Sequence, residues 1–166
     1  METELWLSGV GFPRFSARGC VQELYPIVAQ KDIFQRTVNG DLVYLGGESD
    51  VKYGTTIKCQ DKNIPAFAHL WRGSLIEVGC LQSLIQTCES LKTTLGRPFI
   101  KGSLRVFNAA YEGVKDYILN GQEVTVVSSG GYVSYRPILS MRLTDFTLTH
   151  NEWGSKVGWS LTLEEA

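Results

Sequence analysis

The stretch YRPILSMRLTDFTLTHNEWGSKVGWSLTLEEA, residues 135–166, decides the fold because its apolar residues change phase within one strand. Leu139, Met141 and Leu143 fall on odd positions, whereas Phe146 and Leu148 fall on even ones. Side chains alternate between the two faces of a strand, so one extra residue between Leu143 and Phe146 returns the later ones to the core side. The pattern therefore predicts a β-bulge in a long strand.

A bulge bends a strand and increases its twist, which lets one long strand serve two sheets or turn the corner of a barrel. The segment HNEWGSK, residues 150–156, then reverses the chain into a final alternating strand. We expect a hairpin loop of about four to six residues there, with Gly154 in a strained conformation. Pro137 lacks a backbone N–H, so we expect the early part of the long strand to lie at a sheet edge.

Other segments show the same period of two. In VKYGTTIKC, residues 51–59, the alternation indicates a sheet with one solvent-facing side. In RTVNGDLVYL, residues 36–45, the pair Asn39-Gly40 predicts a hairpin with a type I′ turn, in which both central residues take positive φ. That register places Phe34 and Val38 beside Val43 and Leu45, and leaves the opposite face to Gln35, Thr37, Leu42 and Tyr44.

Two segments leave open the choice between helix and strand. SLIQTCESLKTTLG, residues 83–96, has capping-box spacing, a helical apolar stripe and a glycine stop, so we favour a short helix over residues 83–95. The alternative continues the preceding strand to Leu84 and then forms a loop. Residues 109–119 form either a second short helix or one strand of a hairpin that turns at Asn120-Gly121.

Strand patterns dominate the chain, and no long repeat or Pro/Ser linker divides it. A chain of 166 residues with 43% apolar residues is long enough to build its own core. We therefore predict one domain over residues 1–166 with a mainly β fold. Its architecture is an antiparallel β-sandwich or barrel with one or two short helices.

The composition narrows the classes of partner. The formal charge is −1 and no run of Lys or Arg stands out, so we expect no nucleic-acid partner. The start, METELWLSGVGF, is acidic and no apolar run is long enough for a membrane span, so we expect no membrane partner. The four cysteines form no C-x-x-C pair, which predicts free, mostly buried thiols in a reducing cytoplasm.

The sequence shows no pattern that is typical of an enzyme. His69 and His150 lie outside any metal-ligand spacing, and no G-x-S-x-G element is present. Gly9 and Gly11 match only the first half of a dinucleotide fingerprint. We therefore predict a protein that is not an enzyme, with no cofactor or metal. A small hydrolase is the weakest alternative, because the carboxylates are scattered.

Aromatic and arginine side chains supply the candidate interface. Trp153 lies in the predicted hairpin loop, where an exposed ring either contacts a partner or folds over the sheet end. Trp71 and Arg72 are residue types enriched at interfaces, although a turn anchor explains them equally well. Tyr135 and Arg136 begin the predicted edge strand, which can extend a neighbour's sheet.

Several blocks of the sequence resemble those of a known class of protein. These blocks are FSARGCVQEL, QRTVNGDLVYL, KYGTTIKCQDKNIPAF, WRGSLIEVGC, GRPFIKGS and the C-terminal stretch from Tyr135. The chain resembles small structural proteins encoded among the tail and virion genes of tailed bacteriophages. The similarity spans most of the chain and is weakest over residues 108–130.

This resemblance implies a structural virion subunit of the tail tip or baseplate, assembled in the bacterial host cytoplasm. It also implies a homo-oligomeric ring around the tail axis that contacts other virion tail proteins. Closed rings use heterologous contacts, in which one face of a subunit meets a different face of the next. The second hypothesis is a β-sandwich that binds carbohydrate or a host receptor, which stacked exposed tryptophans would distinguish.

Overall fold

The computed structural model describes residues 3–27, 34–45, 51–127 and 130–166, and within these ranges it contains strands but no helix. The prediction of a mainly β fold is therefore confirmed, and the prediction of one or two short helices is wrong. In chain order the strands are β1 (Trp6–Leu7), β2 (Val21–Ile27), β3 (Phe34–Arg36), β4 (Leu42–Tyr44), β5 (Lys52–Asp61), β6 (Leu75–Gly79), β7 (Leu84–Cys88), β8 (Lys92–Thr94), β9 (Arg105–Phe107), β10 (Gly113–Val114), β11 (Tyr117–Asn120), β12 (Glu123–Val126), β13 (Gly131–Tyr135), β14 (Ile138–His150) and β15 (Val157–Glu165).

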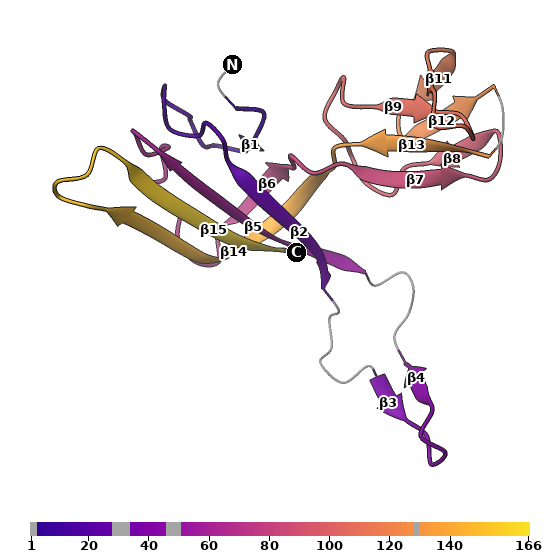
Figure 1. The fold of residues 1–166 in the computed structure, drawn as a ribbon, viewed down its shortest axis with the longest axis horizontal. Coiled ribbons are helices and arrows are strands. Elements are labelled where there is room, and N and C mark those ends of the chain that lie inside the picture. The colour runs from indigo at the N-terminus through magenta and orange to yellow at the C-terminus, as the bar shows by residue number, and fades with distance from the viewer. Residues whose placement is uncertain (1–2, 28–33, 46–50, 128–129) are drawn as a thin grey trace.

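Six strands form a curled antiparallel sheet, half of a barrel, in the order β1-β6-β14-β15-β5-β2 (Figure 1). Their inward side chains, among them Ile57, Met141 and Leu161, are fully buried and form a first hydrophobic core. The rings of Phe67 and Trp159 pack edge to face with centroids 5.2 Å apart. The segment between β5 and β6 therefore covers this core, and we call the sheet with its covering segments the first lobe.

The predicted bulge in β14 is confirmed. The pairing of β14 with β15 shifts between Leu143 and Asp145, so Thr144 is the extra residue. Its hydroxyl donates a hydrogen bond to a carbonyl oxygen of β15 at 3.0 Å. Beyond the bulge Phe146 again packs against the first core, whereas Leu148, nearer the strand end, is exposed. The phase change in the sequence thus marks the place where this strand bends.

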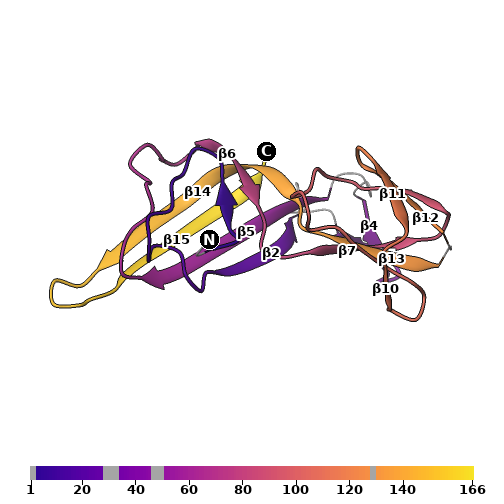
Figure 2. The ribbon, with the colours of Figure 1, turned by 90° about the horizontal axis from the view of Figure 1, so that it is seen from above.

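Residues 84–135 build a second lobe around a separate hydrophobic core. One of its sheets has the order β10-β9-β13-β7 and the other the order β11-β12-β8. The core between them contains Val106, Val124 and Val133, all buried. Figures 1 and 2 both show this lobe at one end of the molecule, beside the half-barrel rather than stacked on it.

Pro137 lies where the chain passes from the second lobe to the first, and the edge-strand prediction is wrong. β13 is flanked by β9 and β7. The N–H of Cys80 donates to the carbonyl oxygen of Pro137 at 3.0 Å, and the N–H of Ile138 donates to that of Pro98 at 2.8 Å. Since neighbours bond this segment on both sides, the missing N–H of proline marks a crossing between lobes and not an open edge.

The two segments with helical patterns are strands. Residues 83–95 contain β7 and β8, and both Cys88 and Leu95 reach the second core from strand segments. Two buried residues seven places apart fit two helical turns, but they fit two short strands equally well. Residues 109–119 contain β10 and the start of β11, so the hairpin alternative is confirmed. Its turn has Gly121 at a φ of 64°, as a type II′ turn requires.

Two predictions about turns are wrong in detail. The Asn39-Gly40 hairpin forms, but Gly40 alone has a positive φ there, and Phe34 pairs with Tyr44. A three-residue turn with glycine in the left-handed region explains this register better than a type I′ turn. The six-residue loop 151–156 agrees with the predicted length, whereas Gly154 does not have a positive φ and carries no such strain.

All four cysteines are free thiols, as predicted. Cys59, Cys80 and Cys88 are buried, and Cys20 is half-buried. Burial raises the pKa of the Cys80 thiol to about 11 and also raises the pKa of Cys59. The thiols of Cys59 and Cys80 are therefore neutral packing groups, since the reactive species of a cysteine is its thiolate.

Candidate interaction surfaces

The hairpin of β3, β4 and their turn, residues 34–45, stands apart from both lobes (Figure 1), and we call it the arm. Every one of its twelve residues is exposed. The exposed large apolar side chains are Phe34, Val38, Leu42, Val43, Tyr44 and Leu45. Apolar side chains on both faces of an exposed ribbon are unfavourable in water and mark a candidate interaction surface.

The arm holds its own shape through local contacts. The rings of Phe34 and Tyr44 lie 5.2 Å apart, and the guanidinium of Arg36 donates to the carbonyl oxygen of Gly40 at 2.8 Å. No arm residue belongs to either hydrophobic core of the described chain. A lone two-stranded ribbon is only marginally stable in water, so a contact that covers the arm would add to its stability.

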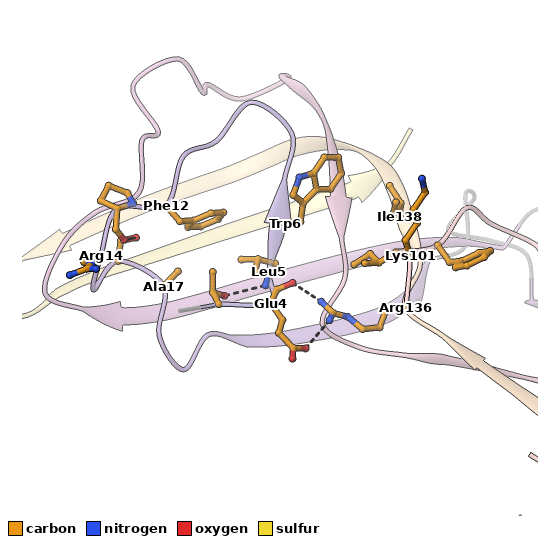
Figure 3. Close-up of a pocket in the computed structure, with 14 residues that line it drawn as sticks. Glu4, Leu5, Trp6, Phe12, Arg14, Ala17, Lys101, Arg136 and Ile138 are labelled. Atoms are coloured by element: carbon orange, nitrogen blue, oxygen red, sulfur yellow. Dashed lines mark hydrogen bonds and ion pairs between the residues drawn. The ribbon is translucent and has the colours of Figure 1, made fainter. Parts of the chain in front are cut away.

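A cavity of about 990 Å³ opens on the first lobe where the N-terminal segment meets the crossing between lobes. Its lining is mostly apolar and includes Trp6, Phe12 and Ile138. Figure 3 shows Arg14 and Lys101 at opposite ends of the cavity, with the two aromatic rings between them. The cavity thus has a mostly apolar floor and a positively charged side chain at each end.

Arg136 forms part of the cavity wall and ties three segments together. Its guanidinium donates to the carboxylate and the carbonyl oxygen of Glu4, at 2.7 and 2.6 Å, and to the carbonyl oxygen of Cys80 at 2.7 Å. The Arg136 side chain is 15% exposed, whereas that of Glu4 is 78% exposed. The predicted interface residue Arg136 is thus mostly buried, and its guanidinium bonds to groups of its own chain.

The other predicted interface residues do not gather at one place. Tyr135 is 3% exposed and packs in the second core beside Phe99, so it is absent from the surface. Trp71 is 69% exposed, and Trp153, in the loop between β14 and β15, is 92% exposed. In the part of the chain that the structure describes, neither tryptophan stacks on another ring, so the stacked pair typical of a sugar platform does not form.

Arg72 is paired next to the bulge. Its guanidinium lies 2.6 Å from the carboxylate of Asp145, and both side chains are largely exposed. The hydrogen bond from Arg72 holds the pKa of Asp145 below its usual range. An exposed ion pair of this kind stabilises a fold little, so Arg72 and the neighbouring Trp71 remain accessible to a partner.

An aromatic cluster on the second lobe was not anticipated from the sequence. Tyr111 stacks on Phe107 with centroids 4.7 Å apart and an interplanar angle of 6°, and it also contacts Tyr132. Tyr111 has a φ of 63°, which is unusual for a residue with a side chain. Asn108 accepts a hydrogen bond from the N–H of Glu112 and so closes this turn. The exposed ring of Tyr111 therefore lies against the rings of Phe107 and Tyr132.

The acidic and histidine side chains of the described residues are either paired within the fold or exposed. Asp61 is buried and accepts hydrogen bonds from Arg18 and from the N–H of Lys62, which together hold its pKa well below its usual range. Both histidines are exposed. Within the described ranges no three His, Cys, Asp or Glu side chains come close enough to hold a metal ion.

The sequence predicted the hairpin at Asn39-Gly40, but we did not predict that it stands apart from the rest of the chain, and we did not predict the cavity. The separate hairpin had a signal in the sequence, because apolar residues lie on both faces of residues 34–45. The cavity had no local signal, since its lining comes from three segments that are distant in the chain.

The described residues include no helix of the length and apolarity needed to cross a membrane. Comparison with family models, with curated proteins and with solved structures gave no match. The resemblance to phage tail proteins therefore stays a prediction from the sequence.

Proposed function

We propose that this chain is a non-enzymatic structural subunit of a tailed-phage virion, in the tail tip or baseplate. It assembles with copies of itself in a ring and with neighbouring virion tail proteins, after synthesis in the host cytoplasm. The observation that carries the proposal is the arm, a ribbon with apolar side chains on both faces that packs on neither core. The placement in a phage virion comes from the resemblance of the sequence blocks to virion proteins.

The chemistry of the surface supports an assembly role. The accessible features are an apolar arm, an apolar cavity and single exposed tryptophans, which are recognition elements for polypeptide. The near-neutral charge adds to this, because a surface largely covered by partners needs few charges for solubility. The arm and the loop after β14 project from different ends of the molecule, so each subunit has more than one point of contact (Figure 1).

The test is whether the chain is a virion component and whether its arm puts it there. Virions are purified from an infected host that produces the tagged full-length chain, and the bound chain is quantified by mass spectrometry. We expect the wild-type chain in every preparation and at least a tenfold loss for the double variant Phe34→Ser/Tyr44→Ser. Ile118→Ser is the matched control, since Ile118 is an exposed apolar strand residue outside the arm. Absence of the wild-type chain from virions overturns the proposal.

The second candidate is binding of carbohydrate, which the fixed ring of Tyr111 favours. A stacked aromatic held at a strained backbone position presents a rigid face, as sugar-binding sites do. A glycan array with the wild-type chain and with Tyr111→Ala, Trp71→Ala and Trp153→Ala distinguishes this function. Binding that Tyr111→Ala removes supports it, and an array without any bound glycan rejects it.

A further inference from the structure

We infer that the cavity beside Trp6 receives the arm of a second copy of this chain. The inference rests on the proposed function, in which the chain assembles with itself, and it names the two surfaces that meet. It makes the contact heterologous: the arm of one subunit enters the cavity of the next, whose own arm is free for a third.

The arm and the cavity match in chemical character. The arm offers Phe34, Leu42 and Tyr44 as exposed apolar side chains, and the cavity offers Trp6 and Phe12 on a mostly apolar lining. A volume of about 990 Å³ lies at the upper end of the range for ligand pockets, about 300–1,000 Å³, and so has room for the side chains of a ribbon.

The charges fit as well. Arg14 and Lys101, at the two ends of the cavity, have no carboxylate within ion-pair distance among the described residues. The arm carries Asp41 beside its turn, and within the same residues this carboxylate is likewise outside every ion pair. Its other charge, Arg36, donates to the carbonyl oxygen of Gly40 in the turn. An arm that enters the cavity turn first brings Asp41 toward one of the two cations, and this contact fixes its orientation.

The positions of the two surfaces make the partner a second chain. Figure 1 shows the arm projecting from one side of the six-stranded sheet, while β1 and the N-terminal segment that line the cavity lie on the other side. The arm therefore points away from the cavity of its own chain. Surfaces on opposite sides of a subunit join copies head to tail, which closes a ring if the rotation between neighbours allows it.

The contact needs enough surface for a specific interface. Such interfaces cover about 800 Å² on each partner. All twelve residues of the arm are exposed, so both of its faces are available to the contact. The contact thus extends beyond the cavity onto the rim, where Glu4 and Lys101 are exposed.

Disulfide trapping between singly substituted full-length chains tests the contact. Val38 lies in the arm turn and is fully exposed, and Arg14 and Lys101 mark the two ends of the cavity. Val38→Cys is mixed with Arg14→Cys or with Lys101→Cys, one partner carrying a mass tag, and the mixture is oxidised mildly. We expect one of these pairs to form the mixed dimer at least tenfold more than Val38→Cys with Ile118→Cys, the matched control on the second lobe.

Adding Phe34→Ser/Tyr44→Ser to the Val38→Cys chain should abolish the excess, because it removes the apolar contacts but keeps the thiol. The wild-type chain, oxidised under the same conditions, shows how much dimer forms through the native cysteines. Equal trapping at Ile118→Cys, or none at the cavity, overturns the inference. If arm variants nevertheless lose incorporation into virions, the proposed function stands and the arm binds another virion protein.

Discussion

The guanidinium of Arg136 donates to both the carboxylate and the backbone carbonyl of Glu4, so the N-terminal segment is anchored to the crossing between the two lobes. The same guanidinium also satisfies the carbonyl oxygen of Cys80. One side chain from the crossing thereby fixes a segment that lies far from it in sequence and completes the wall of the cavity.

Arg136→Met should lower the free energy of unfolding by about 2 kcal/mol, because the part-buried carbonyl oxygen of Cys80 and the more exposed one of Glu4 lose a charged donor. Glu4→Gln should cost less than about 0.5 kcal/mol, since its carboxylate is mostly exposed and its carbonyl is unchanged. Denaturant titration of both variants measures the difference. Equal effects of the two substitutions would show that the exposed ion pair, and not the bonds to the carbonyls, holds the segment.

Asp61 predicts a loss of stability in acid. Its pKa is held below the usual range in the folded chain, chiefly by the hydrogen bond from the Arg18 side chain. The unfolded chain therefore takes up the proton first as the pH falls below about 4, and stability declines from there downward. Asp61→Asn should lower stability at pH 7 and flatten its slope between pH 5 and pH 2. Unfolding curves at a series of pH values measure both effects. If the variant keeps the same dependence of stability on pH, other carboxylates cause the loss of stability in acid.

Gly131 in β13 should tolerate no side chain. A Cβ at this position meets the backbone carbonyl of Phe107 on β9, which cannot move without breaking the pairing of the two strands. We expect Gly131→Ala to cost about 1–3 kcal/mol. Gly158→Ala is the matched control in β15, where the nearest atom lies at an ordinary 3.6 Å. That variant should be neutral or more stable by about 0.5 kcal/mol. Thermal unfolding separates the two, and equal midpoints would contradict the steric argument.

The bulge was predictable because it follows from one local rule. Side chains alternate along a strand, and a shift in the apolar phase before Phe146 requires an extra residue wherever the strand lies in a sheet. The hairpins at Asn39-Gly40 and Asn120-Gly121 could be predicted for the same reason, since turn residues act over a few positions. The pairing register of their strands could not be predicted, because an Asn-Gly pair fits both two-residue and three-residue turns.

The sequence could not show which strands become neighbours. Pro137 indicated a missing donor correctly, but only the tertiary arrangement shows that the segment is bonded on both sides. Likewise Cys88 and Leu95 are both buried, and their spacing fits one helix as well as it fits two short strands. The two separate cores and the cavity arise from contacts between distant segments, and no local pattern encodes those contacts.

The buried thiols provide a test of how rigidly the crossing between lobes is packed. Cys80 is fully buried next to this crossing, and burial raises its pKa to about 11, so little thiolate forms at pH 8. We expect Cys80 and Cys88 to stay unlabelled by iodoacetamide in the native chain over a period in which they react completely in denaturant. Val38→Cys, exposed in the arm, should react at once and serves as the internal reference. Mass spectrometry of the digested chain reports each site. Rapid labelling of native Cys80 would mean that the crossing opens on the timescale of the reaction, in which case the cavity is not a fixed receptor for the arm.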